Sequence, residues 1–469
     1  MRSILLLVLF LGMANFSSAQ ESADALSAFV NSEELKNASV GFSLLDPSGK
    51  EIQSYDSEKS LAPASTVKLL TSITALEVLG YDHKFVTTLT IQGTVMEGKL
   101  IGNVIVKSGG DPTLGASDFK NHYGDFVGEW VEAIKAEGIT EIDGRILIDD
   151  GALEGDRNAG STALNDVGNY YGAGAPGFSF MDNEFTVFFN TTGVGAASMV
   201  VKTEPALSDS VELVNEVKVG SKSGDNVIIY SLDGGNQVFF KGKLPANKKG
   251  FQVRGSIPDV TGFAQAYLQR AIENSGISIT AVEKKGPLFM HSKELVRTKS
   301  PALIEILKVL NKKSVNSYAD VLLKHIGKAS GRAATFEGGS EAVKAYWKEK
   351  GLDTSGIYIE DGSGLSRKNN ITAKFMTGVL QSQVEDEQVN KMMNEASLSS
   401  SVKSMWGEAF RGQIQAKSGY IGRVMAYAGY IIRDGEKYPF YLTVNNFSGS
   451  DSKMRKLMGT ALRGVRLEL

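Results

Sequence analysis

The segment from Pro63 to Gly80 constrains the fold most, because it predicts a helix that carries a hydroxyl and an amine on one face. Proline just before an apolar run and glycine just after it are typical of the two ends of a helix. Ser65 then falls in the first turn, and Lys68, three residues later, lies on the same face. An amine beside a serine hydroxyl can act as its base, which is the logic of a catalytic triad without histidine.

The S-x-x-K spacing is not specific when it stands alone, because short motifs often match by chance. The alternative interpretation is that Ser65 is an ordinary residue at a helix start and Lys68 an exposed charge. The chemistry therefore depends on what the chain carries downstream. The same spacing occurs at Ser117/Lys120, Ser400/Lys403 and Ser450/Lys453.

Composition argues against several classes of protein and site. The 469 residues carry a formal net charge of -3, which argues against general nucleic-acid binding. Cysteine is absent, so the chain has no disulfide framework, no thiolate metal site and no cysteine for a lipid anchor. The four histidines form no H-E-x-x-H motif and leave little material for a Ser-His-Asp triad. We expect neither a metal nor an organic cofactor.

Residues 1–19 are typical of a secretory signal peptide. Arg2 precedes a short apolar run from Ile4 to Met13, and small residues ending at Ala19 follow it. We expect cleavage after Ala19 and a periplasmic protein. An uncleaved anchor is the alternative, although the apolar run is short for a bilayer span. Whether the mature protein associates peripherally with a membrane surface stays open.

The two ends of the chain, residues 20–83 and 287–469, predict one α/β (α+β) domain. A strand hairpin comes first, and helices, three more strands and a last helix come near the end. We expect the hairpin and the three late strands to form one antiparallel sheet with helices packed on it. The predicted strands are 39–45, 51–55, 413–416, 424–432 and 440–444, and the predicted helices are 64–79, 301–310, 317–327 and 452–466.

Residues 84–286 predict a β-rich insertion into that domain. Short β-like runs separated by Gly and Asn turns dominate it, and two helices interrupt them. We expect two nested modules. The predicted strands are 85–91, 103–107, 145–148, 185–189, 227–230 and 237–242, and the predicted helices are 118–137 and 261–274.

Two more short motifs follow in an informative order. Ser314-Val315-Asn316, the only S-x-N in the chain, opens a predicted helix, and Lys417-Ser418-Gly419 lies between two predicted strands. Taken singly, Ser314 is equally well interpreted as a helix N-cap and Lys417 as a solvated strand lysine. The succession S-x-x-K, S-x-N, K-[ST]-G, each on a suitable element, is much harder to obtain by accident.

With these motifs the chain resembles the serine penicillin-binding proteins and β-lactamases. More narrowly, it resembles the D-alanyl-D-alanine carboxypeptidase/endopeptidase family, the class C low-molecular-mass penicillin-binding proteins. The gap between Ser65 and Ser314 fits that family's inserted domains and is too long for a class A β-lactamase. The resemblance implies a penicillin-binding-protein/β-lactamase-like transpeptidase domain interrupted by the β-rich insertion. Further family-like stretches are 109–114, 168–174 and 361–367.

The resemblance and the chemistry together imply a role for each of five catalytic residues. Ser65 would attack the D-Ala-D-Ala peptide bond, with Lys68 as general base. Lys68 needs a lowered pKa, from burial or from a neighbouring cation such as Lys417. Lys417 would also attract the terminal carboxylate of the substrate, and Ser314 would relay the proton to the leaving amine. Asn316 would bind the substrate amide or hold Lys68.

The K-S-G segment would bind the substrate. The backbone N–H groups of Ser65 and of Tyr420, next to Gly419, would form the oxyanion hole, and Ser418 would donate to the substrate carboxylate. The chain departs from the usual family pattern at Val315 and Tyr420. An aromatic ring at Tyr420 can narrow the cleft, so the substrate preference is less determined than the chemistry.

Asp149 and Arg367 are further binding candidates. The resemblance implies that they recognise the amine and the carboxylate of a diaminopimelate side chain, which an acid and a guanidinium suit. The alternative interpretation is a surface pair or a structural salt bridge.

The sequence therefore predicts a periplasmic serine DD-peptidase that acts on peptidoglycan stem peptides and that β-lactams acylate at Ser65. It would trim the terminal D-Ala, cleave cross-links, or both. The alternatives are a β-lactamase or esterase on the same scaffold, and a non-catalytic binding or sensor protein of the envelope.

Overall fold

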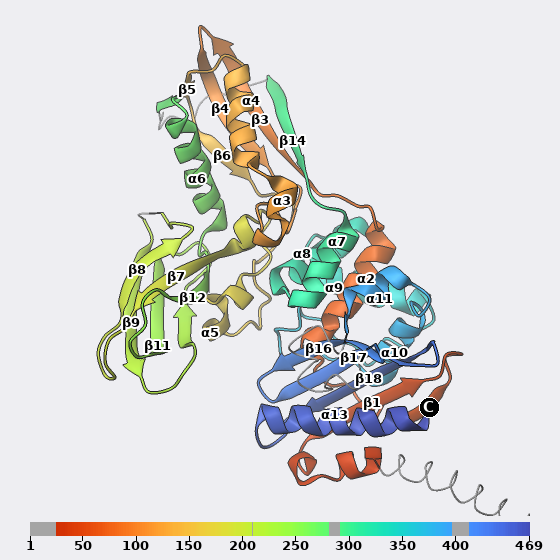
Figure 1. Ribbon diagram of the computed structural model, residues 1–469. Helices are drawn as coiled ribbons and strands as arrows, with labels where there is room; N and C mark the ends of the chain where they lie inside the picture. Colours follow the sequence, from red (N-terminus) through yellow and green to blue (C-terminus); the bar gives the residue numbers. More distant parts are fainter. Residues whose placement is uncertain (1–24, 209, 281–290, 396–411) are drawn as a thin grey trace, which may run out of the picture.

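The computed structural model describes residues 25–208, 210–280, 291–395 and 412–469. Figure 1 shows a lobe that is built on a central sheet and comes from the two ends of the chain. The middle part of the sequence forms a second region that extends away from this lobe. The predicted signal segment, 1–19, lies outside the described residues. Within those described ranges, no helix is long and apolar enough to cross a membrane.

The central sheet joins the two ends of the chain. Its order is β15-β16-β17-β18-β1-β2, and every pair of neighbouring strands is antiparallel. Ser39 in the first strand pairs with Asn445 near the end of the chain, so the prediction of one antiparallel sheet is confirmed. The bounds are β1 Ser39–Leu45, β2 Glu51–Tyr55, β15 Asn394–Glu395, β16 Ile414–Ile421, β17 Val424–Arg433 and β18 Glu436–Asn445.

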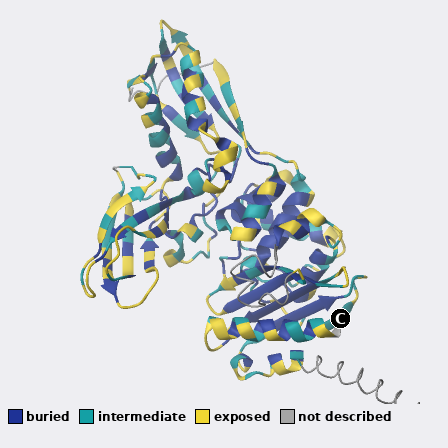
Figure 2. Ribbon diagram, viewed as in Figure 1, coloured by how far each residue is buried: buried dark blue, intermediate teal, exposed yellow. Residues whose placement is uncertain are grey.

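The middle of the sheet is buried on both faces, as the dark blue strands of Figure 2 show. Alternate residues of β17 belong to two different cores. Ala426 and Ala428 face the helices on one side, while Met425 and Tyr427 pack against α13, Asp451–Glu468, on the other. Helices on both faces explain why this strand is a continuous apolar run instead of an alternating one.

Helix α2, Val67–Leu79, lies at the centre of the helical layer. It contacts three other helices, and all of its residues from Val67 to Leu76 are buried. The indole of Trp347 donates a 2.8 Å hydrogen bond to Thr74 in its middle. A helix enclosed in this way has no solvent-facing side over these residues, and its few polar side chains bond inside the core. The other helices of the layer are α7 Leu303–Lys313, α8 Asn316–Ala329, α9 Phe336–Glu349, α10 Ala373–Gln381 and α11 Glu387–Met392.

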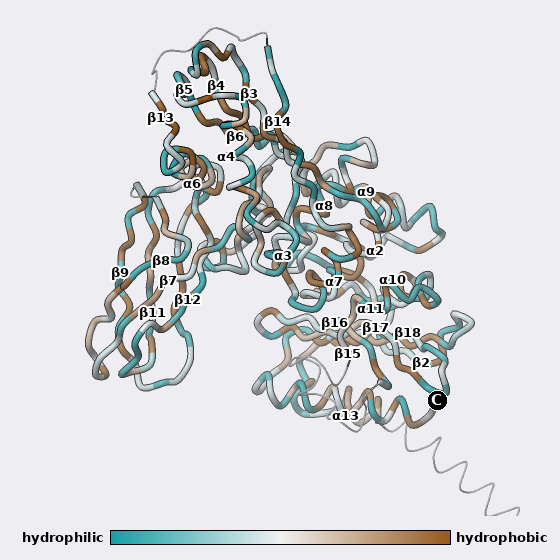
Figure 3. Tube along the Cα trace, turned by 45° about the horizontal axis from the view of Figure 1, so that its top comes forward, coloured by the Kyte–Doolittle hydropathy of each residue, from teal (hydrophilic) through white to brown (hydrophobic). Residues whose placement is uncertain are grey.

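The described part of the inserted region forms three sheets. One has the order β13-β5-β4-β3-β14, with β6 beside β4, and packs against α4, Phe126–Ala136, and α6, Val260–Asn274. The other two, β12-β7-β8 and β10-β11-β9, lie between β6 and α6 in the chain and apart from the central sheet (Figure 3). The bounds are β3 Val86–Met96, β4 Lys99–Lys107, β5 Glu141–Asp143, β6 Ile146–Asp149, β7 Glu184–Asn190, β8 Met199–Glu204, β9 Glu212–Gly220, β10 Asn226–Tyr230, β11 Gln237–Pro245, β12 Phe251–Ser256, β13 Ser278–Thr280 and β14 Ser292–Lys299.

The insertion ends later in the sequence than the predicted boundary at residue 286. That position lies in the segment 281–290, outside the described residues, but β14 beyond it still pairs with β3 along its length. The inserted sheet therefore continues to Lys299, and the chain returns to the central lobe at α7.

The prediction of one helix over residues 118–137 is wrong. The segment divides into a short turn at Ser117–Phe119, a single helical turn, α3, at Lys120–Tyr123, and helix α4. Gly124 adopts a left-handed φ of 56°, which ends α3. Asp125 then caps the next helix by accepting a 3.1 Å hydrogen bond from the N–H of Gly128.

Glycines allow α8 and α9 to touch through their backbones. A Cβ atom added to Gly339 would lie 2.1 Å from the carbonyl oxygen of Leu323, and one added to Gly327 would lie 2.7 Å from the N–H of Gly339. Helix α8 begins with Asn316, so the contact with α9 helps to hold this predicted site residue in position.

We expect Gly339→Ala to lower the free energy of unfolding by about 1–3 kcal/mol, because the new methyl group must push α9 away from α8. Gly160→Ala is a matched control, since a Cβ atom there has no neighbour within 4 Å. Thermal unfolding followed by circular dichroism compares the two variants with wild type. Equal melting temperatures for both variants would contradict the proposed close contact.

Candidate active site

Ser65 lies on a tight turn immediately before α2. The turn spans Ala64–Thr66, and Ala64 adopts an unusual left-handed φ of 45°. Two glycines pack against it. A Cβ atom on Gly364 would lie 2.0 Å from the carbonyl oxygen of Ala64, and one on Gly419 would lie 2.9 Å from the N–H of Ser65. The D-G-S-G stretch and strand β16 therefore enclose the serine and support its strained backbone.

Lys68 is completely buried behind the serine. Its Nζ donates hydrogen bonds to Ser65 Oγ at 3.0 Å, to Asn316 Oδ1 at 2.7 Å and to the carbonyl oxygen of Ser363. Three acceptors match the three N–H bonds of an ammonium group, so the amine has one fixed position. The structure thus brings together three residues that lie far apart in the chain.

Burial controls the protonation of this amine. It lowers the pKa of Lys68 to about 8, against the opposing charges of Asp320 and Asp361. Burial also raises the pKa of the Asp320 carboxyl well above its usual range, and the nearby Asp361 charge adds to that shift. A substantial fraction of Lys68 is therefore neutral near pH 8 and can accept a proton.

Lys417 is the second buried amine of the site. It lies in β16 and donates to Ser314 Oγ at 3.0 Å and to the carbonyl oxygen of Ser418 at 2.7 Å. Burial, together with the charge of Lys68, lowers the pKa of Lys417 well below its usual value. Of the two causes that the sequence analysis left open, burial or a neighbouring cation, burial is the main one at both lysines. A bound carboxylate would favour the charged form of Lys417.

Ser314 and Asn316 lie where α7 ends and α8 begins. Ser314 is the last residue of the α7 turn, with a left-handed φ of 59°, and Val315 occupies the N-cap position of α8. The S-x-N motif opens this helix as predicted, with Asn316 as its first residue, whereas the alternative interpretation of Ser314 as the N-cap of α8 is wrong. The Asn316 amide donates a 2.7 Å hydrogen bond to the carbonyl oxygen of Tyr171, so this side chain connects Lys68 with the inserted region.

The K-S-G segment lies inside β16, not between two strands as the sequence analysis expected. Gly419 allows this strand to approach the Ser65 turn, with Ser418 before it and Tyr420 after it. The Tyr420 hydroxyl donates a 2.6 Å hydrogen bond to Asp451, the first residue of α13. This bond holds the partly exposed ring toward α13.

Asp149 and Arg367 do not meet in a described contact. Asp149 is exposed at the end of β6, where its carboxylate accepts a 3.1 Å hydrogen bond from the N–H of Gly151. Arg367 donates a 2.9 Å hydrogen bond to the carbonyl oxygen of Gly422, just after β16. The binding role expected for the pair stays a prediction.

Asp166 is an acid whose carboxyl feels the charge of Arg367. Burial raises the pKa of this carboxyl, while a 3.3 Å hydrogen bond from the Tyr171 hydroxyl and the Arg367 charge oppose the shift. The sequence analysis missed Asp166, although it lies only two residues before the glycine-rich stretch 168–174. Among the described residues, no group of three or more histidine and acidic side chains is placed to hold a metal ion.

Comparisons with known proteins agree on one family. The model of the "D-Ala-D-Ala carboxypeptidase 3 (S13) family" matches residues 22–463. A D-alanyl-D-alanine carboxypeptidase of Actinomadura sp. strain R39 is 27% identical over 463 residues, which cover 93% of this chain and 84% of the relative. The D-alanyl-D-alanine carboxypeptidase DacB of Haemophilus influenzae is 24% identical over 413 residues, which cover 85% of this chain and 84% of that relative.

Solved structures show the same fold. The crystal structure of penicillin binding protein 4 (dacB) from Haemophilus influenzae superposes with a TM-score of 0.78 at 22% identity, covering 93% of this chain and 98% of that one. The same protein in complex with a β-lactam gives a TM-score of 0.73 at 21% identity. The predicted penicillin-binding-protein-like fold class is confirmed.

We expect the acylation of Ser65 by a chromogenic β-lactam to become faster as the pH rises from about 6, and to level off above the pKa of about 8 of Lys68. Only the neutral amine can take the serine proton, so protonation at low pH removes the base. Stopped-flow acylation rates would show the profile. Lys68→Arg, which stays protonated, should lose about 10²–10⁴-fold in rate at every pH. A flat profile in wild type would contradict this role.

Proposed function

Because the chain belongs to the D-Ala-D-Ala carboxypeptidase 3 (S13) family, we propose that it hydrolyses D-Ala-D-Ala peptides of peptidoglycan through an acyl-enzyme on Ser65. It is a serine-type D-Ala-D-Ala carboxypeptidase, in line with its curated relatives. The observation that carries the proposal is the 3.0 Å hydrogen bond between Ser65 Oγ and the buried amine of Lys68.

Acylation begins when Ser65 Oγ attacks the carbonyl carbon of the scissile peptide bond and its proton moves to neutral Lys68. A C–O bond forms, and the carbonyl becomes an oxyanion that the N–H groups of Ser65 and Tyr420 stabilise. When the intermediate collapses, the C–N bond breaks and the leaving amine takes a proton. The amine is expelled as free D-alanine or as the end of a released strand.

The Lys417–Ser314 hydrogen bond supports the proton path to the leaving amine. Ser314 Oγ can pass a proton from Lys68 to the amine, and Lys417 holds that hydroxyl while it attracts the substrate carboxylate. Water then attacks the ester carbonyl with Lys68 as base, which releases the acid product and restores Ser65. Asn316, which binds Lys68, orients the amine during both steps.

A zwitterionic side chain on the substrate fits the groups beside this site. Asp166 offers a carboxylate for an ammonium group, and Arg367 offers a guanidinium for a carboxylate. Asp166 joins Asp149 as a candidate acid in this part of the proposal, because the charge of Arg367 favours the ionised form of the Asp166 carboxyl. We propose in addition that the protein works in the periplasm, which the signal-like residues 1–19 support.

We expect one benzylpenicillin to add covalently to wild type and none to Ser65→Ala, as measured by intact mass spectrometry. Penicillin is proposed to acylate the same hydroxyl as the peptide. A long-lived adduct together with D-Ala release from D-Ala-D-Ala peptides would support the peptidase. Rapid loss of the adduct with hydrolysed penicillin would favour a β-lactamase instead. The absence of both adduct and hydrolysis would favour a binding or sensor protein.

We expect Arg367→Ala to lower kcat/KM at least roughly tenfold on peptides that carry an intact diaminopimelate side chain, relative to peptides whose side-chain carboxylate is amidated. The reason is that the variant lacks the cation that faces this carboxylate. Arg433→Ala is a matched control, because Arg433 pairs with the exposed Asp434 at the far end of β17. An equal loss on both peptides would show that Arg367 supports the fold and not this preference.

A further inference from the structure

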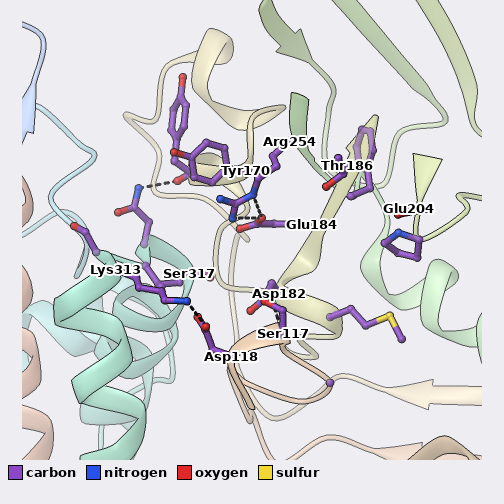
Figure 4. A pocket seen from close by; sticks show the side chains of 18 residues that line it. Ser117, Asp118, Tyr170, Asp182, Glu184, Thr186, Glu204, Arg254, Lys313 and Ser317 are labelled. Carbon is purple, nitrogen blue, oxygen red and sulfur yellow. Dashed lines mark hydrogen bonds and ion pairs between the residues drawn. The ribbon is translucent and has the colours of Figure 1, made fainter. Parts of the chain in front are cut away.

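A cavity of about 510 Å³ adjoins the catalytic residues on the side of the inserted region. Ser314 and Asn316 line one wall, at the junction of α7 and α8. The opposite wall comes from the insertion, as Figure 4 shows with Arg254, Glu184 and Thr186 facing the α7–α8 side across the space. The cavity thus continues the active site away from Ser65.

The wall that the insertion provides is the face of the sheet β12-β7-β8. Arg254, Thr186 and Glu204 are direct neighbours across these three strands. Glu184, two residues before Thr186, shares their face and accepts a 2.9 Å hydrogen bond from Arg254 Nε. The Arg254 guanidinium also lies 4.1 Å from the centre of the Tyr170 ring. These contacts give the wall a defined shape and a fixed pattern of charge.

Two contacts join the α7–α8 side of the cavity to the insertion. Lys313, next to Ser314, forms an ion pair with Asp118 of the insertion. The Tyr318 hydroxyl on α8 donates a 2.8 Å hydrogen bond to Asp182. Asp182 lies in a run of three left-handed residues, Met181–Asn183, with φ values of 51–59°. Such backbone is unfavourable, so a rigid framework must hold it in place beside the cavity.

The position of Ser314 shows which part of a substrate would enter the cavity. In the proposed reaction this hydroxyl faces the leaving amine, so the cavity lies on the leaving-group side of the scissile bond. Its volume is in the range of about 300–1,000 Å³ that is typical of ligand sites. A single D-alanine is far smaller than that. The space therefore suits a leaving group with more residues attached to it.

Charge gives the chemistry of that leaving group. The lining contains the bases Arg254 and Lys313, which suit carboxylates. Acids outnumber bases, which suits the ammonium group that the reaction creates on the leaving side. Burial raises the pKa of Glu184 to about 7, so this acid can also exchange a proton near neutrality. The acidic side chains of the lining are Asp118, Asp182, Glu184 and Glu204.

We propose that this cavity is the leaving-group subsite, which binds the released peptide strand of a cross-linked stem and so directs the enzyme toward endopeptidase cleavage. The ion pairs Arg254–Glu184 and Lys313–Asp118 contact the charged groups of that strand. The inference rests on the proposed function and extends it to a site that the inserted region supplies.

The test compares two substrates on each form of the protein. One is a short peptide that ends in D-Ala-D-Ala, and the other is a cross-linked peptide dimer without sugar. Thr186→Trp fills the cavity, and Arg254→Met removes one ion pair. Arg297→Met is the matched control, because Arg297 pairs with Glu294 on β14, outside the cavity lining. Benzylpenicillin acylation of every variant measures whether Ser65 and its surroundings remain intact.

We expect Thr186→Trp and Arg254→Met to lower the ratio of kcat/KM for the dimer to kcat/KM for the short peptide by at least about tenfold, mainly through KM. Arg297→Met should keep the wild-type ratio. An unchanged ratio in variants that still bind penicillin would overturn the subsite while the proposed function stands. Absence of penicillin acylation in wild type would overturn both proposals.

Discussion

The buried amine of Lys68 is the constraint on which the rest of the structure depends. A lysine without water is costly unless each of its N–H bonds finds an acceptor. Here the acceptors come from the nucleophile turn, the start of α8 and the D-G-S-G stretch. Their convergence fixes the amine beside Ser65, and the same burial brings its pKa into the range where it can work as a base.

The D-G-S-G stretch and β16 must come close to the Ser65 turn to enclose Lys68. Gly364 and Gly419 have no side chain, so the D-G-S-G stretch and β16 can approach the Ser65 turn closely. Asp361 organises that stretch by accepting hydrogen bonds from the N–H groups of Gly364 and Ser366, both at 2.6 Å. Because the site is formed by contacts between backbones, small changes in packing at a distance can displace it.

The sequence predicts the elements of the peptidase domain well, since they follow local patterns. Hydrophobic periodicity and end signals indicated α2, and alternation indicated the central strands. Local patterns failed at residues 118–137, where the positive φ of Gly124 ends one helix before the next begins. They also failed where a strand was longer than its apolar core, which is why K-S-G was expected outside β16. Asp166 was missed because its electrostatic interaction with Arg367 is a tertiary property that no local spacing encodes.

The pairing of Ser39 with Asn445 also has a consequence for how the molecule is made. The first strand of the chain borders one of the last, and the whole insertion lies between them. During synthesis, β1 cannot pair with β18 until the end of the chain has been made. The strands of the inserted sheets, by contrast, are all synthesised before β18. The edge of β1 that faces β18 therefore stays unpaired until the whole insertion has been synthesised. The site around Ser65 also includes β16, so a chain that ends before residue 421 lacks part of its active site.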